Sequence, residues 1–287
     1  MPPQAKVSDP AGIESKSLVG RIVTAVVYAV AVVGVLLLDG VMGTQVPVFT
    51  GLLFGVMSGF AAAEFYALVR REARLPNELF GILAAGIMPV AAALWGSAGL
   101  SAVVTALIAA SLVWHTLIRR TQTADTAITV FGAVYTGFLL AYLVLILRTF
   151  ESGLYLALLV VFSVWVNDVF AYFFGSLLGR HRLAPDISPK KSWEGFLAGA
   201  LGTVVVWCAA SFFEPVGLTF IQALLTGGAI AIAAVFGDLA ESRFKREAGV
   251  KDSGTLLPGH GGFLDRLDSL ILVCLVAFWV LWWGGVR

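Results

Sequence analysis

Long apolar runs dominate the chain, and polar residues are confined to short intervals between them. A helix needs about 20 mainly apolar residues to cross the hydrocarbon core of a bilayer. Nine runs approach or reach that length, at residues 18–38, 46–69, 79–95, 98–118, 127–147, 154–178, 196–213, 217–237 and 269–286. Only Gly96 to Gly99 separate the third run from the fourth, which predicts a tight helical hairpin. The pattern predicts an all-α, polytopic integral membrane protein with about nine transmembrane helices.

Composition supports this interpretation. Hydrophobic residues make up 59% of the 287 residues and charged residues 13%, whereas soluble domains are about 25% charged. The net charge of +1 says nothing about partners, and no nucleic-acid partner is expected. Cys208 and Cys274 lie inside apolar runs without disulfide or metal-ligand spacing, so they are expected to pack in the core.

The distribution of Lys and Arg predicts the orientation. If the amino terminus is cytoplasmic, 17 of the 19 basic residues fall on the cytoplasmic side, and only Arg148 and Arg287 fall outside. The positive-inside rule then predicts an N-in, C-out topology. The first apolar run is longer than a signal-peptide core and lacks a clean cleavage site, so we expect a mature helix.

We expect three regions along the chain. Residues 1–17 form a mobile cytoplasmic tail, residues 18–150 form about five amino-terminal transmembrane helices, and residues 151–287 form the catalytic transmembrane region. Two long cytoplasmic loops, 179–195 and 238–268, belong to the catalytic region.

The second loop is a dense island of charge. Residues 242–268 read SRFKREAGVKDSGTLLPGHGGFLDRLD and contain five cations and four carboxylates around a Gly-His-Gly-Gly turn. Such a mixture suits a site that binds phosphates and a metal. His260 could contact phosphate, stabilise the turn or ligate metal; no second His or Cys is near, so metal ligation is the weakest of the three.

Carboxylates near the two ends of this loop are the candidate metal ligands. Asp238, Glu241 and Lys245 would share a face if the preceding helix continues, and Asp265 and Asp268 are spaced i, i+3 at the start of the last helix. One of the latter pair could simply cap its helix. Carboxylates combined with substrate phosphates suit Mg²⁺, and a second ion would resemble two-metal phosphoryl chemistry.

Two acids lie within apolar runs. Asp168 is about 15 Å from the cytoplasmic end of its predicted helix, at ~1.5 Å per residue. It shares a face with Tyr172 and Gly175, so we expect a polar cavity rather than a dry helix contact, since a buried acid is costly in lipid. Glu64 is open to three interpretations: an ion pair, snorkelling or a role in the site.

The first loop carries a second group of candidates. Ser188 precedes Pro189, which favours an extended turn. Lys190 and Lys191 are expected to open the next helix, where cations oppose the helix dipole unless an anion such as phosphate docks there. Their alternative role is ordinary positive-inside charge.

These segments resemble the phosphatidate cytidylyltransferases, also called CDP-diacylglycerol synthases, of bacterial type. The pattern at residues 242–268 is filled at every defined position, and Asp168-x-x-Ala171-Tyr172-x-x-Gly175, ISPKKSWEG at 187–195 and Gly237-Asp238-x-x-Glu241-Ser242 also fit. Ser192 stands where threonine is more frequent, which keeps the hydroxyl. The specific resemblance covers residues 165–268; the first five helices match in hydropathy and spacing alone.

The resemblance implies a Mg²⁺-dependent enzyme of the cytoplasmic (inner) membrane that converts CTP and phosphatidate to CDP-diacylglycerol and pyrophosphate. It also implies a homodimer, and metal ligation carries over most directly to Asp238 and Asp265. The expected catalytic residues are Asp168, Asp238, Asp265, Asp268, Lys251 and Arg266. The expected substrate-binding residues are Tyr172, Ser188, Lys190, Lys191, Ser192, Ser242, Lys245, Arg246 and His260, and the expected metal ligands are Asp238, Asp265 and Asp268.

Two other functions fit parts of the sequence but not the whole. Buried acids also serve as ion relays in transporters, but the charges gather on one side and no repeated halves are visible. A CDP-alcohol phosphatidyltransferase would carry a DGxxAR motif; here Asp39-Gly40 is followed by VMGTQ, so the motif fails.

Overall fold

The computed structural model describes residues 10–42, 46–70, 75–254 and 261–286, which are mostly helical. The elements are α1 (Pro10–Val41), α2 (Val48–Arg70), α3 (Glu78–Leu117), α4 (Thr123–Ala133), η1 (Val134–Phe138), α5 (Ala141–Thr149), α6 (Gly153–Leu178), β1 (Arg182–Ala184), β2 (Ser188–Ser192), α7 (Trp193–Ala210), η2 (Glu214–Val216), α8 (Phe220–Glu247) and α9 (Leu264–Trp283). Here η1 is a π-helical turn and η2 a 3₁₀ turn. The predicted helical membrane fold is confirmed, with the addition of a short hairpin between β1 and β2.

Six helical segments in the described residues are long and apolar enough to cross a bilayer. They are α2, α3, the continuous stretch Thr123–Thr149, α6, α7 and α8. Within α1 the apolar stretch is the shorter Ala25–Val41. The count of nine spans and the N-in, C-out orientation stay predictions. The helix α1 begins at Pro10, so it reaches back into the predicted tail, and residues 1–9 lie outside the description.

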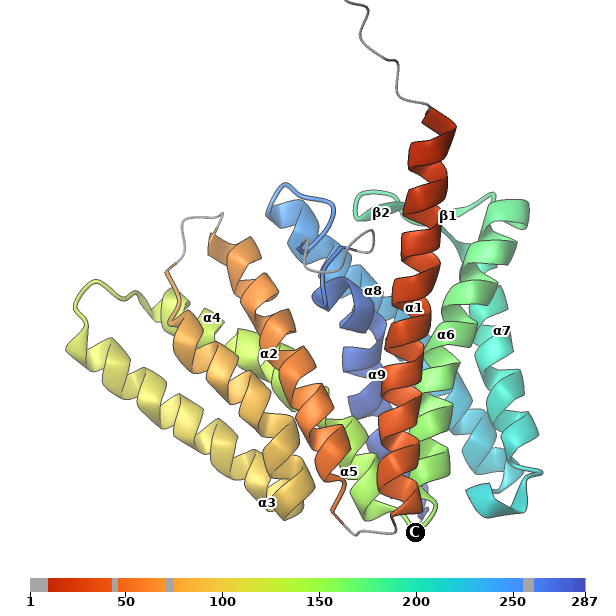
Figure 1. Cartoon of the computed structure of the whole chain (residues 1–287), viewed down its shortest axis with the longest axis horizontal. Coiled ribbons are helices and arrows are strands. Elements are labelled where there is room, and N and C mark those ends of the chain that lie inside the picture. Colours follow the sequence, from red (N-terminus) through yellow and green to blue (C-terminus); the bar gives the residue numbers. More distant parts are fainter. Residues whose placement is uncertain (1–9, 43–45, 71–74, 255–260, 287) are drawn as a thin grey trace, which may run out of the picture.

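Helix α3 is kinked where the sequence predicts a hairpin. Gly96 has φ 64° and ψ −147°, a conformation that residues with a Cβ rarely adopt. Arg148 of α5 donates hydrogen bonds to the carbonyls of Ala93 and Leu94, which end the first arm. It thereby satisfies carbonyl groups that lose their helical partners at the kink. Figure 1 shows the two arms of α3 running in different directions.

Small residues and two hydrogen bonds join α6 closely to α7. The Trp207 indole N–H donates to Ser163 Oγ at 2.6 Å, and the Asn167 amide donates to Thr203 Oγ1 at 3.3 Å. A Cβ added to Gly199 would lie 2.8 Å from the Asn167 carbonyl oxygen. Close backbone approach and interhelical hydrogen bonds are the usual means of packing helices in lipid. They hold the α6 segment that carries Asp168 firmly against α7.

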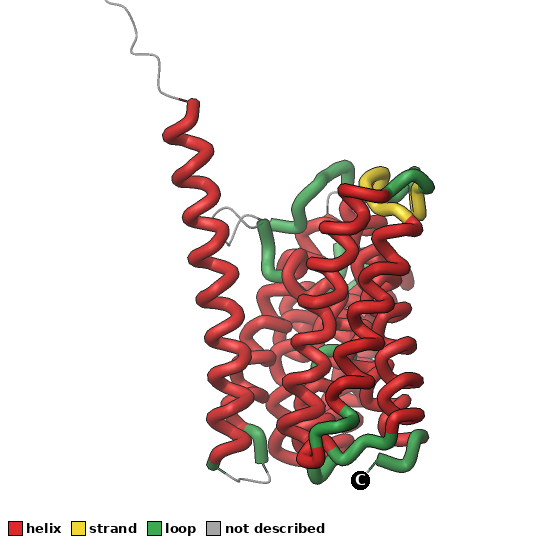
Figure 2. The backbone as a smooth tube through the Cα atoms, turned by 90° about the vertical axis from the view of Figure 1, so that its right-hand side faces the viewer, coloured by secondary structure: helices red, strands yellow, loops and turns green. Residues whose placement is uncertain are grey.

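The polar segments gather at one end of the molecule. The hairpin, the end of α8 and the start of α1 lie there, and the carboxyl terminus lies at the opposite end (Figures 1 and 2). The predicted limits of the second loop, 238–268, are wrong: α8 continues to Glu247 and α9 begins at Leu264. The i, i+4 ion pair between Arg243 and Glu247, 3.0 Å, supports the extra turns of α8.

Candidate active site

Two cavities meet at Asp168 and Asp238. The first, called here the apolar cavity, has a volume of about 600 Å³ and is lined mainly by α1, α2, α6 and α9. The second, called the basic cavity, has a volume of about 510 Å³ and is lined by α6, the hairpin, α7 and α8. Asp168 and Asp238 line both cavities. Tyr172 and Gly175 line the basic cavity beside Asp168, so the predicted cavity on this face of α6 is present.

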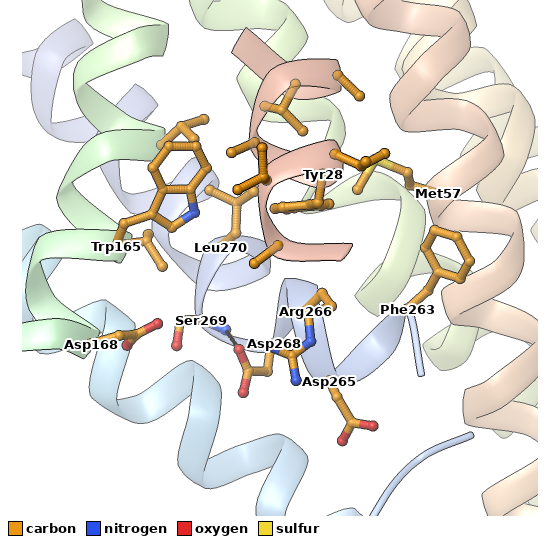
Figure 3. A pocket seen from close by; sticks show the side chains of 18 of the residues that line it. Tyr28, Met57, Trp165, Asp168, Phe263, Asp265, Arg266, Asp268, Ser269 and Leu270 are labelled. Carbon is orange, nitrogen blue, oxygen red and sulfur yellow. Dashed lines mark hydrogen bonds between the residues drawn. The ribbon is translucent and has the colours of Figure 1, made fainter. Parts of the chain in front are cut away.

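The apolar cavity is acidic at one end and apolar at the other. Figure 3 shows Asp168, Asp265 and Asp268 near Ser269 and Arg266, whereas Trp165 and Tyr28 lie on the opposite side. The acids come from α6 and α9, and Asp238 adds a fourth from α8. Three helices, whose acids span 100 positions of the sequence from Asp168 to Asp268, therefore place four carboxylates around one space.

Asp238 is held by two neighbours. Its Oδ2 forms a 2.5 Å ion pair with Lys191 Nζ, and its Oδ1 accepts a 3.2 Å hydrogen bond from the Ser242 hydroxyl one turn later on α8. The hydropathy pattern predicts that its helix ends just before Asp238, which is wrong because α8 runs nine residues past Asp238. The ion pair connects α8 directly to the hairpin.

Asp265 has four hydrogen-bond donors within reach. Lys245 Nζ donates to Oδ1 at 2.7 Å; the Ser253 amide, the Ser253 hydroxyl and the Gly262 amide donate to Oδ2 at 3.0, 2.9 and 2.8 Å. Lys245 also pairs with Glu241, whose side chain is fully buried. Helix α8 continues through Asp238, Glu241 and Lys245, which is the condition under which the sequence places them on one face. Asp265 thus joins the end of α8 to both sides of the loop before α9.

Asp268 lies one turn further into α9. Its Oδ1 accepts a 2.6 Å hydrogen bond from the adjacent Ser269 amide, and Arg266 also lines the cavity. Among the residues that the structure describes, no three His, Cys, Asp or Glu side chains converge closely enough to hold a metal ion.

The hairpin lysines do not open a helix, contrary to the sequence analysis. Lys190 and Lys191 lie in β2, which pairs antiparallel with β1, and Ser192 is the N-cap of α7. Strand pairing keeps the backbone extended through Ser192, whose hydroxyl accepts a 3.2 Å hydrogen bond from the Gly195 amide. Because the two lysines do not lie in the first turn of a helix, the helix dipole gives no reason to expect a phosphate beside them. Both lysines nevertheless line the basic cavity.

The other predicted site residues are distributed unevenly. Tyr172 is 80% exposed and lines the basic cavity with Ser192. Ser188 pairs with Ala184 in the hairpin.

Arg246 donates hydrogen bonds to the Ile187 and Val250 carbonyls, so it holds the hairpin against α8. Lys251 is exposed in the loop after α8. His260 lies outside the described residues.

Four contributors were missed or left open by the sequence analysis. Arg182 adds a third cation to the basic cavity. Glu194 accepts hydrogen bonds from the Arg180 and His181 amides and contacts His181 Nδ1 at 2.6 Å, so it anchors the start of the hairpin. Ser253 bridges carboxylates, and Glu64 turns out to face the loop before α9. Only Ser253 and Glu194 lie in the quoted motifs; no local pattern identifies Arg182 or Glu64.

The fold and the site define a helical integral membrane protein with acidic residues between an apolar and a basic cavity. Residues 19–283 match the model of the cytidylyltransferase family, which covers most of the chain. The chain belongs to the cytidylyltransferase family.

Several curated relatives are named phosphatidate cytidylyltransferase. The protein from Staphylococcus haemolyticus (strain JCSC1435) is 41% identical over 155 residues, which are 54% of this chain and 58% of the relative. The protein from Thermotoga maritima (strain ATCC 43589 / DSM 3109 / JCM 10099 / NBRC 100826 / MSB8) is 43% identical over 150 residues, 50% of this chain and 55% of the relative. The matched segments therefore span somewhat more than half of each relative's length.

Proposed function

We propose that this protein is a phosphatidate cytidylyltransferase that converts CTP and phosphatidate to CDP-diacylglycerol and pyrophosphate. The observation that carries the proposal is the meeting of an apolar and a basic cavity at Asp168 and Asp238. A lipid phosphate and a nucleotide triphosphate differ in the surroundings that they require, and each cavity suits one of them. The name shared by the curated relatives supports the same reaction.

In the proposed reaction a phosphate oxygen of phosphatidate attacks the α-phosphorus of CTP. The bond from that phosphorus to the bridging oxygen breaks, and pyrophosphate leaves with the bonding electrons. Lys190, Lys191 and Arg182 would neutralise the triphosphate in the basic cavity. The apolar part of the other cavity, near Trp165 and Tyr28, would take the acyl chains. Catalysis of this kind depends on positioning and charge neutralisation rather than on a covalent intermediate.

The carboxylates fit a magnesium ion that is shared with substrate phosphates. Asp238, Asp265 and Asp268 are the predicted ligands, and all three line the same cavity. Four donors already surround Asp265, which favours Asp238 and Asp268 as the residues that would hold the ion. Bound Mg²⁺ would supply charge stabilisation to the phosphoryl oxygens.

The active site is proposed to face the cytoplasm of a bacterial inner membrane, where CTP is available. The predicted charge bias supports this orientation, since the polar end of the molecule carries the hairpin and the loop before α9. Homodimer formation, implied by the family resemblance, stays a prediction.

Pyrophosphate release tests the proposal. Purified protein in lipid nanodiscs is given CTP and Mg²⁺, with phosphatidate or with diacylglycerol, which lacks the attacking phosphate. We expect release with phosphatidate alone, and its loss when EDTA is added or Asp238→Asn is used. Equal release with diacylglycerol would instead indicate CTP hydrolysis and would contradict the proposed acceptor.

A further inference from the structure

Glu64 is a buried acid that the proposed reaction does not use. It lies on α2, in the amino-terminal half, and is 5% exposed. Its carboxylate accepts hydrogen bonds from the Phe263 amide (3.1 Å), the Leu264 amide (2.8 Å) and the Ser253 hydroxyl (3.1 Å). All three donors are nearly 200 residues away in the sequence. Glu64 is therefore neither an isolated charge in lipid nor a residue that snorkels to the surface.

Helix α9 depends on Glu64 for its amino-terminal cap. The N-cap position, Phe263, provides no side-chain hydrogen bond to its own helix. The first amides of a helix lack internal partners, and a carboxylate at this end is stabilising. Asp265, the acid in the first turn, is engaged with Lys245, Ser253 and Gly262 instead. A side chain from α2 thus does what a local Ser, Thr or Asp normally does.

The surroundings of Glu64 leave little room for another arrangement. A Cβ added to Gly262 or to Gly254 would lie 2.5 or 2.8 Å from the Glu64 carboxyl carbon. One turn earlier on α2, Phe60 stacks on Phe263 with ring centroids 5.0 Å apart and an interplanar angle of 15°. The loop before α9 is therefore held against one face of α2 at two successive turns, with glycine where the acid approaches closest.

Ser253 connects Glu64 to the acids of the cavity. Its hydroxyl lies 3.1 Å from Glu64 Oε2 and 2.9 Å from Asp265 Oδ2. A hydroxyl has one hydrogen to donate, so it serves one carboxylate at a time. From Asp265 the contacts continue through Lys245 to Glu241. A continuous polar network thus runs from α2 to α8 beneath the start of α9.

We propose that Glu64 is a positioning residue for the reaction: it holds the first turn of α9, and with it Asp265 and Asp268, against α2. This inference rests on the proposed function. It also assigns the amino-terminal half a part in catalysis, although that half contributes none of the predicted catalytic residues.

The test compares Glu64→Gln with Asp39→Asn. Asp39 is a natural control because it is 3% exposed and caps another helix, accepting hydrogen bonds from the Phe49 and Thr50 amides at the start of α2. Glutamine keeps the size of Glu64 but replaces one acceptor oxygen with an NH₂ donor. Each variant replaces a buried carboxylate that caps a helix with a neutral amide, but only Glu64 is connected to the candidate active site.

Steady-state kinetics and hydrogen exchange are measured on both variants in nanodiscs, well below their unfolding temperatures. For Glu64→Gln we expect kcat to fall at least ~10-fold, which is about 1.4 kcal/mol of transition-state stabilisation, with KM for CTP changed less than about threefold. The peptide that contains Phe263 and Leu264 should exchange faster. Asp39→Asn should retain the wild-type kcat, even where its thermal stability falls equally.

Wild-type kcat in Glu64→Gln, or an equal fall in Asp39→Asn, would overturn the positioning role. Unchanged exchange at Phe263 and Leu264 would overturn it as well, because the cap would then be dispensable. If the wild-type protein itself fails to release pyrophosphate, the proposed function fails, whereas the exchange measurement still reports whether Glu64 holds α9. The two failures are therefore distinguishable.

Discussion

At the scale of single residues, the four aspartates of the cavity have different surroundings. Asp168 is exposed and lines both cavities, whereas Asp238 pairs with Lys191 and Asp265 is surrounded by donors. Removing a carboxylate that has many internal partners lowers the stability of the fold, because its buried donors lose their acceptor. Substitutions at the four positions should therefore separate loss of activity from loss of stability.

Asp168→Asn should lower turnover strongly and leave stability near that of the wild type, since the carboxylate faces the cavities. Asp265→Asn should lower both, because buried donors lose a charged acceptor, at a cost of about 1–3 kcal/mol. Turnover and thermal unfolding of the two variants check this contrast. Full activity in Asp168→Leu would remove Asp168 from the reaction.

Asp238→Asn and Asp268→Asn should each reduce turnover at least ~100-fold, as expected for losing several kcal/mol of transition-state stabilisation. If both hold one ion, the double variant should be little worse than either single one. Rate measurements over a range of Mg²⁺ concentrations check this. Small effects that simply add would show that these carboxylates do not share a metal.

Lys191→Gln should impair the reaction more than Lys190→Gln. Both lysines line the basic cavity, but Lys191 also pairs with Asp238, so its loss removes a cation and disturbs a carboxylate. We expect a higher KM for CTP in each variant and a lower kcat in Lys191→Gln. Unchanged kinetics in the double variant would show that the two lysines serve only as positive charges that orient the chain in the membrane.

At the scale of elements, hydropathy predicted where helices occur, because apolar length is a local property of the sequence. It predicted their ends poorly. Helix α8 runs past residue 237, since Glu241 and Lys245 pair within the structure and make a charged helical end stable. Lys190 and Lys191 were predicted to open a helix, but they lie in strand β2 of the hairpin. The role of Glu64 could not be predicted, because its donors lie in a segment that only the folded chain brings to α2.

The kink of α3 offers a test at this scale. Arg148→Met should destabilise the protein by about 1–3 kcal/mol, because the Ala93 and Leu94 carbonyls lose a charged donor. Turnover below the unfolding temperature should be unchanged, since the kink lies at the end of the molecule away from the hairpin. Arg120→Met, at an exposed position, is the matched control. Equal stability of the two variants would show that Arg148 does not secure the kink.

At the scale of the whole molecule, the two ends differ in polarity. The hairpin and the loop before α9 lie at one end, and the carboxyl terminus lies at the other (Figure 1). The same division follows from the placement of Lys and Arg, 17 of 19 on one predicted side. Asp168 and Asp238 line both cavities, so each cavity gives a separate approach to them, as the proposed reaction of a lipid with a nucleotide requires.

Orientation is tested by labelling single cysteines in a background without Cys208 and Cys274. Gly249 follows α8 at the polar end, and Gly217 precedes α8 at the opposite end. A membrane-impermeant thiol reagent should label Gly249→Cys only from the cytoplasmic side and Gly217→Cys only from outside. Labelling of both from the same side would contradict the predicted topology.

In the proposed function, the two cavities bring a nucleotide and a lipid phosphate together for transfer of a cytidylyl group. The most direct measurement follows the label of CTP that carries ³²P at either the α- or the γ-phosphate, with phosphatidate as acceptor. We predict that the α-label appears in the lipid fraction and the γ-label in pyrophosphate, and that Asp238→Asn abolishes both. A lipid fraction that stays unlabelled with α-labelled CTP, or that acquires the γ-label, would contradict the proposed cytidylyl transfer.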